Sequence, residues 1–320
     1  MTLPTTDERN ASLAARLQPF PHTATIALRL LELWPEHRRY VETRFQVIDP
    51  SFEGRIDELA ELALKVIGTE LDVYCAGYRW MCEAYIDEEF YFRRHGQYRL
   101  STFADTLEQV YSRPEIMGKY VRALLISQII WDTHAHGFDC FRTDFLSAAP
   151  PGAQYLEVGP GHGLFLYFAS QVEQIARLEA WDISKSSIAE TQHALKTLGA
   201  TRPIEIIEQD VLVAPTRRDE FDMAVISEVL EHLERPDLAL QSLQAALKPG
   251  GRVYINAPVN SPAPDHIYNW ASTDAFTQFV IDQGFEIEQA RLFPVTGATL
   301  DRALRKNLAI SCVIIARKPL

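Results

Sequence analysis

The sequence predicts an α/β fold in which a mostly parallel β-sheet, with helices on both faces, follows an all-helical N-terminal domain. Two observations lead to this prediction. Residues 1–149 keep helical spacing of their apolar side chains, whereas residues 150–320 alternate short apolar runs with helical segments. The turn Pro150-Pro-Gly152 separates the two patterns, so we expect domains at 1–149 and 150–320.

The N-terminal part predicts a succession of helices. Pro19, Pro21 and Pro35 interrupt the helical pattern, and Gly68 can close a helix. The expected helices span residues 7–17, 24–47 with a break at Pro35, 56–67 and 70–95, and further helices begin near Ser101 and at Pro114. The run 70–95 is rich in aromatic side chains, which are more typical of a core than of a cofactor site.

The C-terminal part predicts strands and helices in alternation, which is the pattern of a parallel sheet. The expected strands are residues 155–158, 178–181, 204–207, 223–227, 252–257, 285–292 and 308–316. The expected helices between them include residues 187–198, 236–247 and 273–283.

Composition and charge narrow the class of protein. The 320 residues can bury a substantial core, and 47% hydrophobic with 23% charged residues is normal for a globular chain. The formal net charge of -12 argues against a nucleic-acid partner, because phosphate contact needs clustered Lys and Arg.

Location is inferred from cysteines and targeting signals. The 4 cysteines form no C-x-x-C pair, so we interpret them as reduced packing residues. The N-terminus lacks the basic and apolar stretches of a signal peptide, and no apolar run is long enough to cross a bilayer. We therefore expect a cytoplasmic protein without a membrane partner.

The segment from Tyr155 to Gly163 organises the C-terminal part. A short apolar run is followed by glycines at alternate positions, Gly159, Gly161 and Gly163, and then by a helical pattern. Glycine allows the chain to reverse sharply and lets a ligand approach bare backbone, with the first helical N–H groups pointing at it. The dinucleotide fingerprint would place its third glycine at Leu164 instead.

Together with Glu157 this segment reads E-x-G-x-G-x-G, which resembles motif I of the class I S-adenosylmethionine (SAM)-dependent methyltransferases. The resemblance covers residues 150–320 in order. It implies a Rossmann-like sheet of seven strands with the last one antiparallel, SAM as cofactor and S-adenosylhomocysteine as product. The alternative is an ordinary strand-to-helix turn with packing glycines.

Two strand ends carry further cofactor residues that the resemblance implies. Asp182, with Ile183 beside it, ends the second strand and would bind both ribose hydroxyls through its two carboxylate oxygens. Asp210 ends the third strand and would contact the adenine amino group, with the Val211 N–H on a ring nitrogen. The alternatives are a helix-capping role for Asp182 and a turn-forming role for Asp210.

The string Ser227-Glu-Val-Leu-Glu-His232 closely resembles the fourth-strand motif of the ubiquinone-type and natural-product methyltransferases. The resemblance places Ser227 and Glu228 near the methionine end of SAM, and His232 toward the acceptor. His232 is the leading candidate for general base, since imidazole titrates near neutral pH. His266 is the second candidate, followed by Glu228 and Glu231; the alternative for His232 is a purely structural histidine.

A second histidine group, His134 and His136 with Asp132 and Asp139 nearby, suggests a metal at first sight, because alternate residues of an extended segment share one side. No further ligand follows at a recognised spacing. We therefore expect no metal here, but helix capping or contact with the substrate.

These inferences combine into one functional prediction. The chain is expected to be a SAM-dependent methyltransferase that methylates a small, specialised metabolite on O, N or C by in-line displacement. A homodimer through the N-terminal helices is also expected. One alternative is a nicotinamide-dependent oxidoreductase, which is disfavoured because Leu164 stands where the dinucleotide fingerprint needs glycine. The other is a non-catalytic SAM-binding protein.

Overall fold

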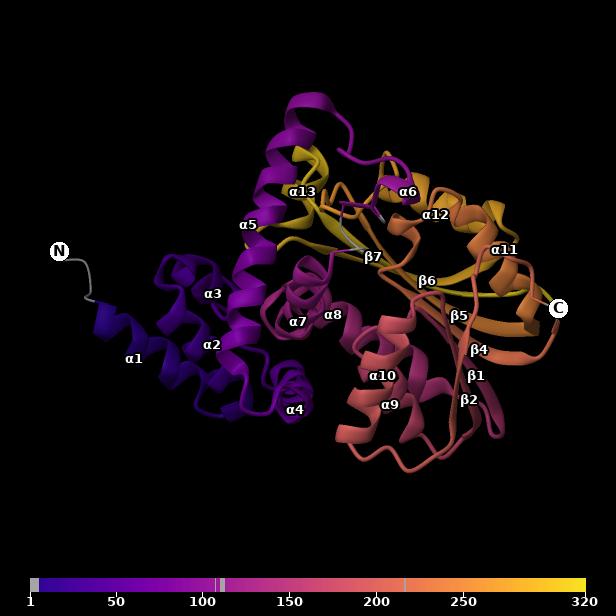
Figure 1. Cartoon of the computed structure of the whole chain (residues 1–320), viewed down its shortest axis with the longest axis horizontal. Helices are drawn as coiled ribbons and strands as arrows, with labels where there is room; N and C mark the ends of the chain where they lie inside the picture. The colour runs from indigo at the N-terminus through magenta and orange to yellow at the C-terminus, as the bar shows by residue number, and fades with distance from the viewer. Residues whose placement is uncertain (1–5, 107, 110–112, 216) are drawn as a thin grey trace.

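The computed structural model describes residues 6–106, 108–109, 113–215 and 217–320. A group of helices forms one side of the molecule and a twisted sheet with its flanking helices forms the other (Figure 1). Residues 1–5, part of the N-terminal stretch in which a signal peptide was sought, lie outside the described residues. No helix in the described ranges is both long and apolar enough to span a bilayer.

The predicted helices of the N-terminal part appear in the predicted order, and one further helix covers residues 132–140, where an extended segment was expected. They are α1 (Thr6–Leu17), α2 (Pro21–Leu33), η1 (Pro35–His37), α3 (Arg38–Arg44), α4 (Pro50–Ile67), α5 (Leu71–His95), α6 (Phe103–Thr106), α7 (Pro114–Ile130) and α8 (Asp132–Cys140). Two short turns, η3 (Phe141–Phe145) and η4 (Leu146–Ala148), lead to the sheet.

Local chemistry sets several of these boundaries. Pro35 separates α2 from α3, and Gly68 ends α4 with a φ of 59°, both as predicted. The start of α4 was placed too late, because the Asp49 side chain caps it by accepting hydrogen bonds from the Ser51 and Phe52 amides. The cap of α6 was placed one residue early, since Thr102 rather than Ser101 accepts from the Asp105 amide.

The sheet has seven strands in the order β3-β2-β1-β4-β5-β7-β6. Their bounds are β1 (Ala153–Val158), β2 (Ile175–Asp182), β3 (Ile204–Glu208), β4 (Phe221–Ser227), β5 (Leu247–Val259), β6 (Glu286–Pro294) and β7 (Ile310–Arg317). Strand β7 is antiparallel to both β5 and β6, whereas β1 to β5 pair in parallel. The predicted seven-stranded Rossmann-like sheet with an antiparallel last strand is confirmed.

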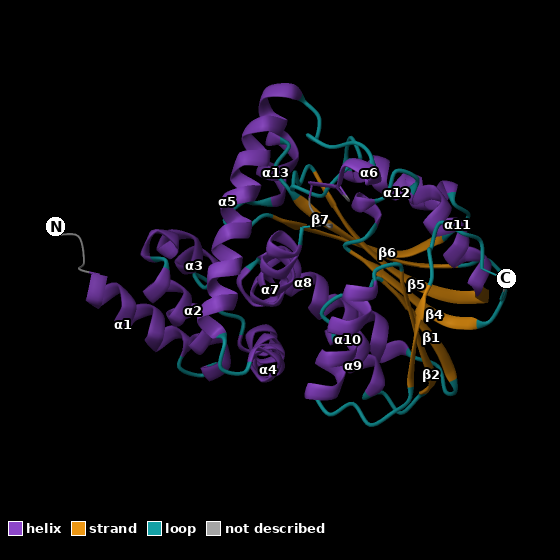
Figure 2. Ribbon diagram, viewed as in Figure 1, coloured by secondary structure: helices purple, strands orange, loops and turns teal. Residues whose placement is uncertain are grey.

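Helices cover both faces of this sheet (Figure 2). The sequential elements are α9 (Leu164–Ser170), α10 (Lys185–Thr197), η5 (Leu230–His232), α11 (Pro236–Ala246), α12 (Thr273–Asp282) and α13 (Leu300–Lys306), of which α13 was not predicted. Alternate residues of β4 face opposite ways: Met223 joins one buried cluster with α8 and α9, and Ala224 joins another with α11 and α12.

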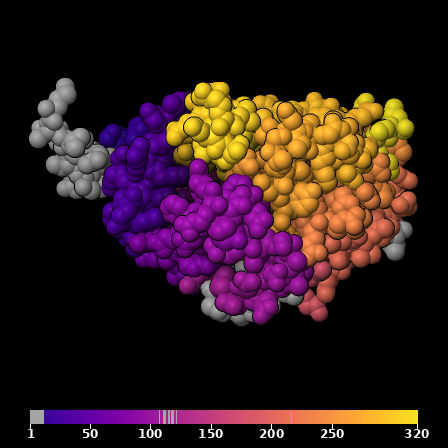
Figure 3. All heavy atoms as spheres, turned by 90° about the horizontal axis from the view of Figure 1, so that it is seen from above, coloured from indigo at the N-terminus to yellow at the C-terminus, as the bar shows by residue number. Residues whose placement is uncertain are grey.

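The N-terminal helices share their core with the sheet. One buried cluster runs from Leu13 in α1 to Tyr254 in β5, and the Tyr254 hydroxyl donates to the Gly137 carbonyl of α8 at 2.7 Å. The Tyr40 hydroxyl of α3 donates to the Thr296 hydroxyl at 2.9 Å. In Figure 3 residues near the C-terminus, in yellow, lie against the N-terminal helices, in indigo. The division at 149/150 therefore stays a prediction, because this core continues across it.

Candidate active site

The glycine bend lies between β1 and α9. Gly159, Gly161 and Gly163 have φ values of 67°, 48° and 74°, a region that favours glycine. A Cβ on Gly159 would lie 2.6 Å from a methyl carbon of Val229, so the space is also closed to other residues. The Thr191 hydroxyl of α10 donates to the Gly161 carbonyl at 2.7 Å and holds the bend against that helix. The bend predicted from the sequence is present.

Glu157 lies on β1 directly below the bend and is buried. Its carboxyl group accepts a hydrogen bond from the Tyr155 hydroxyl at 2.9 Å. Burial raises the pKa of Glu157 to about 8, and the Tyr155 hydrogen bond opposes this shift. The carboxyl group is therefore largely protonated at neutral pH; its contact with a cofactor stays a prediction.

Asp182 ends β2, and both of its oxygens have partners. One accepts from the Ser184 amide at 2.8 Å and the other from the Ser187 hydroxyl at 2.6 Å. Ser184 itself caps α10 by accepting from the Ser187 amide. The N-cap of α10 is therefore Ser184 and not Asp182, and the Asp182 carboxylate retains further lone pairs for ribose hydroxyls. Burial is the largest cause that raises the pKa of Asp182. Ile183 beside it is 54% exposed.

Asp210 follows β3 in a turn. Its carboxylate accepts from the Leu212 amide at 2.8 Å, which is the turn-forming alternative. The Val211 side chain is buried, and its amide has no hydrogen-bond acceptor within the described ranges. An amide without a protein partner is available to a ligand such as an adenine ring nitrogen.

The strand order aligns these residues along one edge of the sheet. Because β3, β2, β1 and β4 are neighbours in that order, their carboxyl ends present Asp210, Asp182, the glycine bend and Ser227 in succession. It is also the order in which the resemblance predicts that these residues contact the adenine, ribose and methionine parts of SAM.

Asn256 of β5 connects the end of β4 to the rest of the site. Its amide nitrogen donates to Glu228 at 2.9 Å and to the Ser227 hydroxyl at 3.3 Å, and its oxygen accepts from the Ser311 hydroxyl at 2.7 Å. Burial raises the pKa of Glu228 to about 7. Sequence reasoning missed Asn256; a lone amide in the apolar run Val253 to Ala257 was the available signal.

His134, on helix α8 of the N-terminal part, also lies near Glu228 at the end of β4. Its Nε2 lies 4.0 Å from Glu228 Oε2, and burial lowers the pKa of His134 to about 3. His136 points elsewhere and stacks between Phe52 and Phe293, with ring centroids 4.2 Å and 5.0 Å away. The extended segment assumed from the sequence was wrong: the segment is helical, and residues two apart on a helix lie on different faces.

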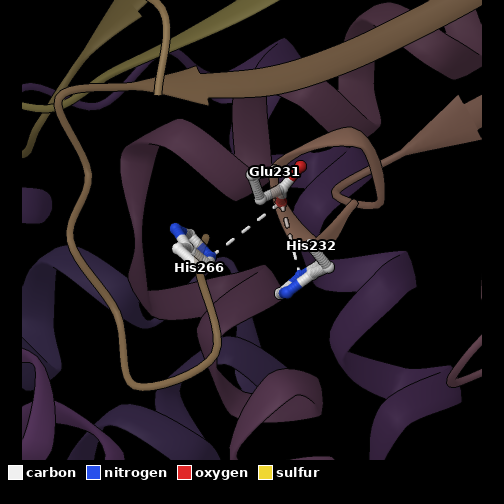
Figure 4. A group of neighbouring side chains, drawn as sticks. All are labelled: Glu231, His232 and His266. Atoms are coloured by element: carbon white, nitrogen blue, oxygen red, sulfur yellow. Dashed lines mark ion pairs between the residues drawn. The ribbon is translucent and has the colours of Figure 1, made fainter. Parts of the chain in front are cut away.

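Glu231, His232 and His266 form a compact group (Figure 4). Glu231 Oε1 lies 3.6 Å from His232 Nε2 and 4.0 Å from His266 Nε2. The two imidazole rings meet edge to face with centroids 4.9 Å apart. The predicted catalytic residues His232, His266 and Glu228 are thus brought to the carboxyl end of β4 by η5 and the loop after β5.

The loop after β5 is held on η5 by backbone hydrogen bonds. The Ile267 and Tyr268 amides donate to the Glu231 carbonyl at 2.9 Å and 3.0 Å. His232 Nδ1 lies 3.0 Å from the Asp265 carbonyl, and His266 Nδ1 lies 2.6 Å from the Ser261 carbonyl. Each Nδ1 therefore donates a hydrogen bond to a backbone carbonyl. The sequence did not single out Asp265.

Aromatic side chains from α5 and from the segments that follow α5 and α7 border His266 and His134. The Tyr85 and Tyr98 rings lie 6.3 Å and 6.1 Å from that of His266, and the Trp131 ring lies 4.9 Å from that of His134. Tyr78 instead belongs to the buried core and accepts a hydrogen bond from Trp131. The aromatic stretch is thus partly core and partly lining of the site.

Comparison with known proteins shows what this domain resembles. Residues 156–255 match the family described as methyltransferase domain. The strand order and the glycine bend agree with this match, so the domain resembles the class I SAM-dependent methyltransferases, whose cofactor is SAM.

Named relatives agree with this class. The ubiquinone/menaquinone biosynthesis C-methyltransferase UbiE of Vibrio vulnificus is 30% identical over 120 residues, covering 36% of this chain and 46% of the relative. The ubiquinone biosynthesis O-methyltransferase of Xylella fastidiosa is 30% identical over 135 residues, covering 39% and 53%. The chain thus spans about half the length of these curated relatives.

A solved structure with a similar fold is the N-methyltransferase NodS from Bradyrhizobium japonicum, in complex with S-adenosylhomocysteine. It is 16% identical with a TM-score of 0.45, and the match covers 59% of this chain and 88% of that one.

Proposed function

We propose that this protein transfers the methyl group of SAM to a small-molecule acceptor, a specialised metabolite, on O, N or C. The observation that carries the proposal is the succession of Asp210, Asp182, the glycine bend and Ser227 along adjacent strand ends. It matches the order of adenine, ribose and methionine along an extended SAM molecule, so the sulfonium methyl would lie beside Ser227 and Glu228.

The reaction is an in-line displacement. A nucleophilic atom of the acceptor forms a bond to the methyl carbon as the bond from carbon to sulfur breaks, and the electron pair stays on sulfur. The sulfonium group is already activated, so the protein contributes chiefly alignment and exclusion of water. Glu228, His232 and His266 are the residues proposed to act on the acceptor, by holding it or by taking its proton.

The surroundings favour a small acceptor over a macromolecule. The ends of β4 and η5 lie under the N-terminal helices, with Tyr85, Tyr98 and Trp131 beside the histidines. Aromatic walls suit a small apolar or amphipathic ligand. The net charge of -12 disfavours nucleic acid as a partner.

Three further expectations belong to the same proposal. The free cysteines of the described chain suit a reducing, cytoplasmic location without a membrane partner. A homodimer formed through the N-terminal helices would be detected by light scattering, and a monomer at all concentrations would refute it.

The decisive experiment is mass spectrometry of the protein as purified, followed by a metabolite screen for SAM-dependent gain of one methyl group. Asp182→Ala is expected to weaken SAM binding because the ribose loses its carboxylate. His232→Ala is expected to spare SAM binding and slow turnover. Equal loss of SAM affinity in both variants would remove His232 from the acceptor side, and methylation of only tRNA or protein in a lysate would overturn the small-molecule assignment.

A further inference from the structure

Glu231 is the most unusual polar side chain in the described part of the chain. It is 0% exposed, and neither of its carboxylate oxygens has a hydrogen-bond partner. An unpartnered carboxylate in an apolar interior destabilises the fold unless something compensates for it. The Glu228 side chain interacts with the Glu231 carboxyl group, and Glu231 Oε1 lies 3.6 Å and 4.0 Å from the Nε2 atoms of His232 and His266.

The three potential ligand atoms lie within 4.8 Å of one another. A central ion at ordinary bond lengths of roughly 2.0–2.2 Å holds its ligands about 3–4.4 Å apart, so small side-chain adjustments would bring all three into contact. The Nδ1 contacts of both imidazoles to the Asp265 and Ser261 carbonyls orient the rings so that each Nε2 faces Glu231. Such contacts to the second ring nitrogen are typical of metal-binding histidines.

We propose that Glu231, His232 and His266 bind a divalent transition-metal ion. Two imidazoles and one carboxylate suit zinc-like ions better than magnesium, which prefers oxygen ligands alone. Glu231 comes from η5 and His266 from the loop after β5, so only the folded chain assembles the set. No metal was expected from the sequence, in which His134 and His136 were the histidines considered as ligands, and the structure separates those two.

The proposed ion also indicates which atom of the acceptor is methylated, and this inference rests on the methyltransferase function proposed for the protein. A metal with three protein ligands keeps open positions, and a hydroxyl group bound there loses its proton more readily. The acceptor is then a hydroxylated molecule: its proton passes to the Glu228 carboxylate, its oxygen bonds the methyl carbon, and the bond from carbon to sulfur breaks. His232 and His266 act as ligands in this scheme, and not as bases.

The test for the ion is calorimetric titration of the full chain, treated with chelator, with zinc, manganese or magnesium chloride. We expect one zinc ion per chain, and affinity weakened by more than about tenfold in Glu231→Gln and His266→Ala. His136→Ala is the matched control with unchanged affinity. Cobalt(II) absorption bands of the wild type provide a readout that does not depend on the folding of any variant. Absence of zinc binding, binding of magnesium only, or unchanged affinity in both ligand variants would overturn the proposal.

The acceptor is tested by determining which atom of the product from the metabolite screen carries the new methyl group. We expect methyl on oxygen, with the rate lost after chelation and regained with zinc; methyl on nitrogen or carbon, or unchanged turnover without metal, would refute this step. SAM titration into metal-free protein separates the two proposals. If SAM binds and zinc does not, only the metal inference fails; if zinc binds and SAM does not, the methyltransferase proposal fails.

Discussion

His134 Nε2 of helix α8 lies 4.0 Å from Glu228 Oε2 at the end of β4. The helical part of the chain therefore contributes a side chain to the site formed by the sheet. The contact is partly buried, and desolvation lowers the pKa of His134 to about 3, so the imidazole is neutral at physiological pH. It can position the Glu228 side chain without adding a charge.

Replacing His134 by alanine is expected to lower kcat about tenfold or more while leaving the Kd for SAM unchanged, because the contact is on the acceptor side. Steady-state kinetics with the screened acceptor and calorimetry with SAM check this. His136→Ala, two residues further along the same helix but directed away, is the control and should retain normal kcat. A similar loss in both variants would indicate damage to α8 rather than to the site.

Gly159→Ala is expected to destabilise the fold by about 2–4 kcal/mol and to weaken SAM binding. The new methyl group meets Val229 at 2.6 Å in addition to the strain of a φ of 67°. Gly152→Ala is the matched control, since its φ is 78° but nothing lies within 4 Å of the added Cβ. Urea unfolding should show only about 1 kcal/mol for the control. Equal losses would mean that close approach to Val229 has no effect.

The buried carboxyl group of Glu157 makes stability depend on pH. Its pKa in the folded chain, about 8, lies above the ordinary value of 4.5, so the folded state binds more protons between these values. Stability is therefore greatest below pH 4.5 as far as this group is concerned, and it is lost as pH rises toward 8. Glu157→Gln keeps the acceptor for Tyr155 and removes the titration.

Urea unfolding of wild type and Glu157→Gln at pH 5 and pH 8 measures this difference. The wild type should lose on the order of 3 kcal/mol more than the variant over that interval. Parallel pH profiles for the two proteins would show that the carboxyl group titrates normally in the folded chain.

The ion pair between Arg44 and Glu53 joins α3 to α4, with a distance of 2.6 Å and each side chain 2% exposed. Arg44→Met is expected to cost about 3–5 kcal/mol, since it leaves the Glu53 carboxylate buried without its partner. The double variant Arg44→Met/Glu53→Leu should recover most of that loss. Thermal and urea unfolding of the three proteins test this, and a double variant as unstable as the single one would contradict it.

The local features of the site were predictable from the sequence. The glycine bend follows from three glycines that must adopt positive φ, and the strand ends at Asp182, Asp210 and Ser227 follow from short apolar runs. Seven strands and an antiparallel last strand were expected through the resemblance, and the topology confirms them. These features depend on backbone preferences over a few residues.

Tertiary structure alone decided which side chains meet. Helical rotation separated His134 from His136, and the packing of α8 against the sheet brought His134 to Glu228. The loop after β5, pinned to the Glu231 carbonyl, carried His266 to a carboxylate that the sequence had treated only as a possible base. A sequence encodes local turns and periodicity, but contacts between residues distant in the chain depend on how whole faces pack. For this protein the glycine bend and the strand ends beside it were therefore predictable from local sequence patterns. The group of Glu231, His232 and His266 depends on tertiary packing, which local patterns do not determine.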